Sequence, residues 1–174
     1  MTTGATVLET ARLTLRELVP EDMDFLAGML ADPEVSHHYE RRFTREAAAV
    51  WLDRQLVRYR DDGHGFWLAS ERSTGEPVGQ VGLLRQTVEG VTRPEIGWLL
   101  HRPFWGKGYA TEAAAAVRDA AFARWNYPEV ISLIRPANVA SQQVAARIGM
   151  TPEPARVHFN GLEHIVYRIE RGEE

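Results

Sequence analysis

The chain has no cysteine among its 174 residues. This absence excludes disulfides, thiol nucleophiles and thiolate metal sites. No apolar run approaches the ~20 residues that span a bilayer, and the first ten residues, MTTGATVLET, lack the charged and apolar regions of a signal peptide. The missing features together predict a cytoplasmic protein that contacts no membrane.

The chain also lacks an excess of positive charge, since 20 Lys and Arg stand against 24 Asp and Glu, which gives a formal net charge of −4. The nearest thing to a basic block, HHYERR at 37–42, is interrupted by Glu40, so we expect no nucleic-acid partner. Apolar residues make up 44% of the chain and charged residues 25%, which is ordinary for a globular protein. The length suits one domain over residues 1–174, as a monomer or a homodimer.

Hydrophobic periodicity predicts an α+β fold. Helices are expected from Pro20, after Thr44, after a glycine loop near residue 106, and from Asn138, where the residue types suit helix starts. Strands are expected over residues 11–18, 66–71, 77–84, 96–100, 130–134, 155–159 and 164–170. We therefore predict one mixed, mostly antiparallel twisted sheet of six to seven strands with about four helices.

The most informative stretch is EIGWLLHRPFWGKGYATEAAAAVR, residues 95–118. A strand, a glycine turn and a helix in that order leave free backbone N–H groups at a helix N-terminus, which attracts phosphate. The spacing does not match a Walker loop, because His101 replaces its first glycine. It does not match the dinucleotide fingerprint either, because Thr111 replaces its last glycine. Gly108 and Ala110 do match Gln/Arg-x-x-Gly-x-Gly/Ala, although Trp105 replaces the leading residue.

That last pattern is the pyrophosphate loop of the GCN5-related N-acetyltransferases. Further pieces in the same order are ARLTLREL, DPEV at 32–35, EIGW at 95–98, GKGYATEA at 106–113 and N-x-x-S at 138–141. The chain thus resembles this family, and within it the branch that acetylates N-terminal alanines of ribosomal proteins. The resemblance implies acetyl-CoA as co-substrate and an amine as acceptor, with no metal.

The family's cofactor contacts carry over onto matching positions. The pyrophosphate would lie on the backbone N–H groups of the loop, with a threonine hydroxyl in reach, and a bulge would splay the central strand so that its backbone pairs with the pantetheine arm. The residues implied are Gly106, Lys107, Gly108, Tyr109, Ala110 and Thr111 for the pyrophosphate, and Leu99, Leu100 and His101 for the pantetheine.

The catalytic residues leave alternatives open. An amine is mostly protonated at neutral pH, so a base is useful, and Glu95 opens the central strand where relatives place an acid. It is either that base or a surface carboxylate that pairs with Arg93. Relatives use a tyrosine to protonate the leaving thiolate, but Ala145 stands at that position. Ser141 and Asn138 remain, either for the cofactor or only as caps of the helix.

Tyr39 and Glu40 lie between the first two predicted helices, where the family's acceptor groove begins, and we expect them to contact the substrate. The sequence thus predicts an N-acetyltransferase that passes an acetyl group directly from acetyl-CoA to a primary amine, on a protein N-terminus or a small molecule. The alternative is an acyl-CoA sensor that binds without turnover. A nucleotide-binding protein is a weaker rival, because both nucleotide-loop spacings fail.

Overall fold

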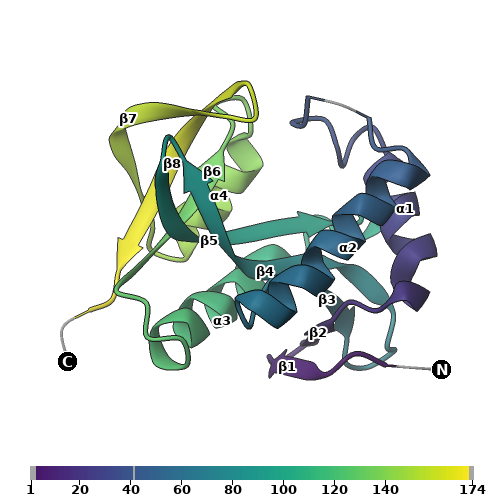
Figure 1. Ribbon diagram of the computed structural model, residues 1–174. Helices are drawn as coiled ribbons and strands as arrows, with labels where there is room; N and C mark the ends of the chain where they lie inside the picture. Colours follow the sequence, from purple (N-terminus) through teal and green to yellow (C-terminus); the bar gives the residue numbers. More distant parts are fainter. Residues whose placement is uncertain (1–2, 41, 173–174) are drawn as a thin grey trace.

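The computed structural model describes residues 3–40 and 42–172. All its strands belong to one eight-stranded sheet, in the order β1-β2-β3-β4-β5-β6-β8-β7, with helices packed against it (Figure 1). The strands are β1 (Thr6–Glu9), β2 (Leu13–Glu17), β3 (Phe66–Glu71), β4 (Pro77–Val88), β5 (Val91–Leu100), β6 (Glu129–Ile134), β7 (Thr151–Phe159) and β8 (Leu162–Glu170). The helices are α1 (Met23–Ala31), α2 (Arg45–Asp61), α3 (Tyr109–Ala123) and α4 (Val139–Arg147), with short 3-10 helices η1 (Pro20–Asp22) and η2 (Arg102–Phe104).

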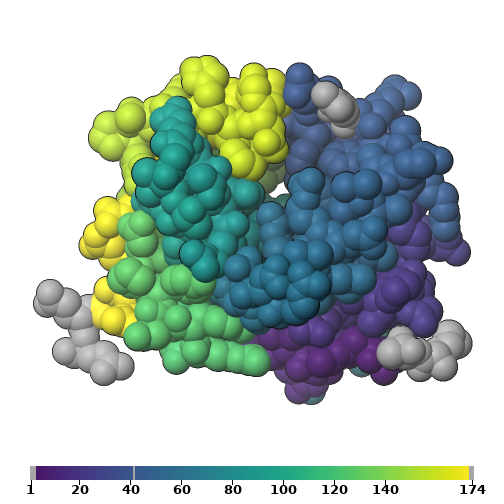
Figure 2. Space-filling model, viewed as in Figure 1, coloured from purple at the N-terminus to yellow at the C-terminus, as the bar shows by residue number. Residues whose placement is uncertain are grey.

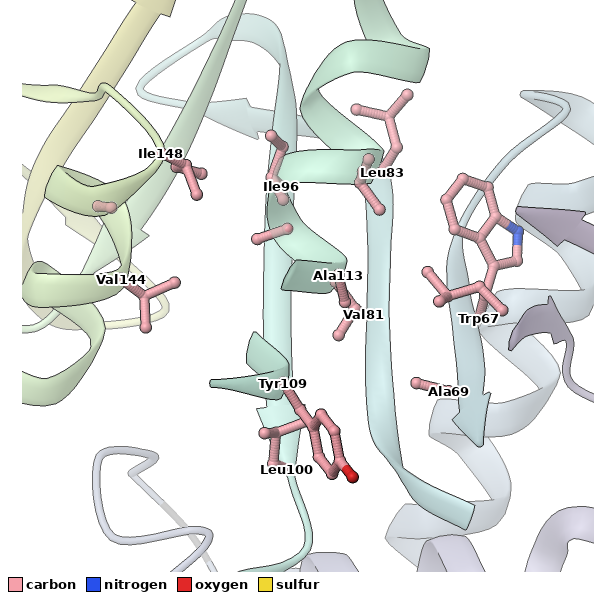
Figure 3. Close-up of a cluster of buried hydrophobic side chains, with 14 of the residues drawn as sticks. Trp67, Ala69, Val81, Leu83, Ile96, Leu100, Tyr109, Ala113, Val144 and Ile148 are labelled. Carbon is pink, nitrogen blue, oxygen red and sulfur yellow. The ribbon is translucent and has the colours of Figure 1, made fainter. Parts of the chain in front are cut away.

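Two hydrophobic clusters cover the two faces of the sheet. Neighbouring residues of β3 show this, because successive side chains of a strand point to opposite faces. Trp67 and Ala69 belong to the cluster that packs under α3 and α4, whereas Leu68 belongs to the cluster under α1 and α2. In the first cluster Ala113 of α3 and Val144 of α4 lie against the sheet (Figure 3). Small side chains let α3 approach the strands closely, and Ala113 is completely buried.

The sheet opens between its two central strands. The β4–β5 pair is antiparallel and continuous over ten residue pairs. The next pair, β5–β6, is the parallel one, and it is registered at a single position, Glu95 opposite Ile131. The two strands therefore diverge beyond Glu95, toward the carboxyl end of β5. This splay gives the exposed central-strand backbone that the family resemblance implied, without a register shift in the β4–β5 pair.

The α+β class, the mixed sheet and the four helices are confirmed. The strand count is eight rather than six to seven, because the sequence analysis missed β1. That strand is a four-residue edge strand whose end residues, Thr6 and Glu9, are exposed, so it has no buried periodic pattern, and its pairing with β2 defines it. The predicted helix caps are confirmed: Thr44 Oγ1 accepts from the Ala47 N–H at 3.1 Å, and Asn138 Oδ1 accepts from the Ser141 N–H at 3.1 Å.

Candidate active site

The glycine loop places a free helix N-terminus at the molecular surface. Gly106 and Gly108 have φ of 75° and 79°, a left-handed conformation that L side chains rarely adopt. Gly108 is the N-cap of α3, and its carbonyl accepts the first helical hydrogen bond, from Glu112 N–H at 3.0 Å. The N–H groups of Tyr109, Ala110 and Thr111 therefore have no acceptor within the helix. The loop has the donors that a pyrophosphate requires.

An arginine from β2's leading segment holds this loop in place. Arg12 donates through Nη1 to the Lys107 carbonyl at 2.9 Å and through Nε to Glu112 Oε2 at 2.6 Å, and its guanidinium lies over the Tyr109 ring. The Tyr109 hydroxyl donates to Glu71 Oε1 at 2.5 Å. The sequence analysis assigned no role to Arg12, because its partners are about a hundred residues away in the chain.

The direction of the N–H groups on β5 follows from its register. His101 N–H donates to the Val78 carbonyl at 2.9 Å, and in an antiparallel pair alternate residues bond to the same neighbour. Odd-numbered residues of β5 thus face β4, and the N–H groups of Trp98 and Leu100 face the opening beside β6. Of the three predicted pantetheine contacts, only Leu100 offers an N–H to that opening. The backbone N–H groups of Leu99 and His101 face β4, and the N–H of Trp98, which the sequence analysis did not name, faces the opening.

A cavity of about 890 Å³ lies beside this opening. Its walls come from the segment after α1, from α2, from β5 and β6, from the start of α4, and from the β7–β8 turn. The surface is hollowed between the segment after α1 and that turn (Figure 2). Of the predicted site residues, the cavity brings together Tyr39, Glu40, Glu95, Leu99, Asn138 and Ser141. Leu100, His101 and the loop residues 106–111 do not line it.

Glu95 is a buried carboxylate in the cavity wall. It is 9% exposed, and its Oε2 has no hydrogen-bond partner among the described residues. Burial raises the pKa of Glu95 to about 8, although the positive charge of Arg58 and the amide of Gln86 offset part of that rise. Arg93, the alternative partner suggested by sequence, pairs instead with Glu129 and Glu153. Glu95 is therefore neither a surface carboxylate nor a member of that ion pair.

Ser141 lies on the other side of the β5–β6 opening, in the first turn of α4. Its backbone N–H is capped by Asn138, and its Oγ accepts a hydrogen bond from Trp98 Nε1 at 3.2 Å. Because the indole only donates, the hydroxyl hydrogen of Ser141 remains available to donate elsewhere. Ala145, which occupies the position of the family's tyrosine, is completely buried. Capping and a contact to the cofactor are thus compatible roles for this turn.

Aromatic rings form the wall next to Tyr39. The Tyr39 ring lies edge-on to Phe43 and Trp51, with centroids 5.4 and 6.2 Å apart, and Trp51 stacks on Phe66 at 5.5 Å. Phe66 covers Gly97 of β5 closely enough that a Cβ there would be 2.6 Å from Phe66 Cζ. The Tyr39 side chain itself is 39% exposed. The sequence analysis named Tyr39 as a substrate contact but did not name the other rings, because aromatic residues in helices and strands are also typical of a hydrophobic core.

Within residues 3–40 and 42–172, no helix is long and apolar enough to cross a membrane. The same ranges contain no group of three or more His, Cys, Asp or Glu side chains placed to hold a metal ion.

Comparison with known proteins identifies the family. Residues 12–151 match the model of the acetyltransferase (GNAT) domain. FsC-acetyl coenzyme A-N(2)-transacetylase of Aspergillus fumigatus is 33% identical over 95% of this chain and 73% of its own length. An acetyltransferase structure from Agrobacterium tumefaciens superposes with a TM-score of 0.85 at 32% identity, covering 98% of both chains.

The ribosomal branch is represented by a solved structure as well. The ribosomal L7/L12 α-N-protein acetyltransferase, determined with coenzyme A, superposes with a TM-score of 0.75 over 95% of this chain and 98% of that one. At 16% identity this likeness shows a shared fold. Together with the domain match, these comparisons confirm the predicted family: the chain belongs to the GNAT acetyltransferases and is an acetyl-CoA-dependent N-acetyltransferase.

Proposed function

We propose that the acceptor is a primary amine that enters the 890 Å³ cavity and attacks acetyl-CoA directly, in a ternary complex. The observation that carries this proposal is the buried Glu95 carboxylate, which lines the same cavity as the splayed strand. A base and a cofactor opening that share one cavity allow amine and thioester to meet without a covalent enzyme intermediate. The absence of cysteine agrees with direct transfer.

The acceptor amine must lose a proton before it can attack, and Glu95 is the proposed base that accepts this proton. With a pKa near 8, its carboxylate accepts a proton from an α-ammonium group, whose pKa is also near ~8, at little cost in free energy. The amine lone pair then attacks the thioester carbonyl carbon, the C–S bond breaks, and the electron pair leaves on sulfur. Glu95, directly or through a water molecule, holds the proton that the ammonium group loses before attack. The second proton leaves the nitrogen as the amide forms and passes to the departing sulfur, so that CoA is released as the thiol.

The backbone of β5 and the start of α4 complete the proposed reaction. The N–H of Trp98 or Leu100, facing the opening, is placed to stabilise the oxyanion that develops on the thioester oxygen. The free hydroxyl hydrogen of Ser141, whose oxygen is already engaged by Trp98, is placed to donate to the departing sulfur. A thiolate is a tolerable leaving group, so positioning supplies much of the rate. Asn138 supports Ser141 through the cap.

We further propose the cofactor contacts that the glycine loop suggests. The N–H groups of Gly106, Lys107, Gly108, Tyr109 and Ala110, with the Thr111 hydroxyl, hold the pyrophosphate. Tyr39 and Glu40 contact the acceptor at the cavity mouth. Two similar proteins favour a primary amine, because one is named for N(2) transacetylation and the other for acetylation of a protein α-amine.

The experiment measures free thiol released from acetyl-CoA over a panel of amines and short peptides. Glu95→Gln should lower turnover about a hundredfold, with acetyl-CoA affinity almost unchanged. The wild-type rate should rise with pH through about 8 as Glu95 loses its proton. In the variant, the rate should rise only with deprotonation of the acceptor amine itself. Normal turnover by the variant from pH 6 to 9 would exclude Glu95 as the base. Acetyl-CoA binding with no thiol release for any amine would instead favour the acyl-CoA sensor.

A further inference from the structure

Arg135 stands one residue beyond the end of β6, on the cavity side of the sheet. Side chains alternate along a strand, and Val130 and Ile134 of β6 belong to the core under α3 and α4. Residues 131, 133 and 135 therefore point to the opposite face, which carries α1 and α2. Leu133 and Arg135 both line the cavity. The arginine thus shares a face and a cavity with Glu95.

The Arg135 side chain has no partner among the described residues. Its Nε is buried and makes no hydrogen bond, and Arg135 forms no ion pair with any carboxylate that the structure describes. A buried donor without an acceptor costs free energy, more so when it carries charge. Structural arginines in this protein are satisfied, as Arg16 is by Asp22 and Arg93 by Glu129. Arg135 therefore has donors that a ligand can satisfy.

The surroundings of Arg135 favour an anion. Burial lowers the pKa of His38 and of His164, and the positive charge of Arg135 lowers both further. The first turn of α4, which begins four residues later at Val139, adds the partial positive charge of a helix N-terminus. The other charged side chains of the cavity wall are Glu40, Arg42, Arg54, Arg58 and Glu95.

Glu95 forms the opposite pole of the cavity. It pairs with Ile131, and Arg135 follows four residues later, so Arg135 lies about 13 Å further along the strand direction at a rise of ~3.3 Å per residue. Both side chains are long and extend from the same face, which leaves a span suited to a short zwitterion. The aromatic wall of Tyr39, Phe43 and Trp51 offers apolar contact in the same cavity.

We propose that Arg135 is the binding residue for a carboxylate on the acceptor, and that the acceptor is an amine that also carries a carboxylate. The inference rests on the proposed function of the cavity. It extends that function by naming a charged group of the acceptor that takes no part in the transfer. The carboxylate comes either from a free amino acid or from an acidic side chain near a peptide N-terminus.

The test compares acceptors that differ by one carboxylate. Phenylalanine and 2-phenylethylamine share an apolar body, and the dipeptide amides Asp-Ala and Asn-Ala share a free α-amine. The wild-type enzyme should favour the carboxylate-bearing member of one pair at least tenfold in kcat/KM, and that pair identifies the source. Arg135→Gln should remove the preference by raising the acceptor KM about tenfold, and Arg135→Lys should retain part of it. Arg147→Gln, an equal charge change at an exposed position of α4, should leave both constants unchanged.

The proposal is overturned if the wild type shows no preference in either pair. It is also overturned if Arg135→Gln raises the KM of both members equally or alters only the acetyl-CoA KM. Failure to acetylate any amine would contradict the proposed function, and calorimetry then tests the subsite by itself. The probes are 3-phenylpropionate and succinate, which carry carboxylates but no amine. At least one of them should bind to the wild type at least tenfold more tightly than it binds to the Arg135→Gln variant. Equal affinity for both probes would exclude the subsite.

Discussion

At the scale of single residues, Glu95 shows how burial converts an ordinary carboxylate into a group that titrates near pH 8. Its pKa in the folded chain is raised above the ordinary 4.5. Because the folded chain holds this proton more tightly than the unfolded chain, the contribution of Glu95 to the free energy of unfolding is complete below pH 4.5. That contribution is lost as the pH rises through about 8. The group that suits the proposed base also weakens the unliganded fold at alkaline pH.

Glu95→Gln should therefore stabilise the protein in a pH-dependent way. The melting temperature of the variant relative to wild type should rise from pH 5 to pH 9, reaching a gain of several degrees, because ~1 kcal/mol shifts a domain of this size by ~2–4 °C. Scanning calorimetry without acetyl-CoA measures it. Glu76→Gln, at an exposed position in the β3–β4 turn, is the matched control. A difference that stays constant across this pH range would mean that Glu95 is not strongly desolvated.

At the scale of elements, the glycine loop and α3 act as one unit. The left-handed Gly108 lets the chain enter α3 with its first N–H groups free, and Arg12 connects the loop carbonyl to Glu112 of the helix. A side chain on Gly108 would strain its φ of 79° and place a Cβ 3.4 Å from Arg12 Nη2. Substitution there disturbs the backbone donors and the residue that holds them.

Gly108→Val should weaken acetyl-CoA binding at least tenfold, which is ~1.4 kcal/mol. Calorimetric titration of the folded variant, checked by circular dichroism, gives the affinity. Gly90→Val is the control, because Gly90, in the β4–β5 turn, has a φ of 81° and no atom within 4 Å of the position that a Cβ would occupy. Equal affinity losses in both variants would indicate general strain, and no loss in Gly108→Val would remove the pyrophosphate from this loop.

At the scale of the whole molecule, His64 connects distant parts of the chain. It is fully buried, with Nδ1 2.7 Å from the Leu83 carbonyl and Nε2 2.8 Å from the Tyr127 hydroxyl. Because a carbonyl only accepts, Nδ1 carries the proton and Nε2 accepts from tyrosine. One imidazole thus joins the segment after α2, strand β4 and the segment between α3 and β6. Burial lowers the pKa of His64, against the opposing effect of the Leu83 carbonyl.

The unfolding free energy of the protein should accordingly fall as the pH decreases below the ordinary histidine value of about 6.5, since the unfolded chain binds a proton that the folded chain resists. His64→Gln should cost about 1–3 kcal/mol at pH 8 through lost buried hydrogen bonds, and should reduce the slope between pH 7.5 and 5.5. Urea unfolding at several pH values measures both. His38 and His164, whose pKa values burial also lowers, leave a residual slope. The exposed His158→Gln should keep the full wild-type slope, and an unchanged slope in His64→Gln would contradict the assignment.

The sequence by itself determined the features that depend on neighbouring residues. The caps at Thr44 and Asn138, the glycine loop before α3 and the four helices follow from local chemistry, and the order of the motifs was sufficient to predict the family. The exposed edge strand β1 was missed, because its local pattern is weak and its pairing with β2 decides it.

Only the tertiary structure decided which groups share a site, which way their N–H groups point and how readily they hold a proton. The register of β4 against β5 directs the Leu100 N–H into the opening and the His101 N–H away from it. The pKa of Glu95 depends on side chains that bury it from other elements, and Arg135 shares its cavity only because β5 and β6 lie side by side. Desolvation and strand register depend on residues far apart in the chain, so no local pattern encodes them.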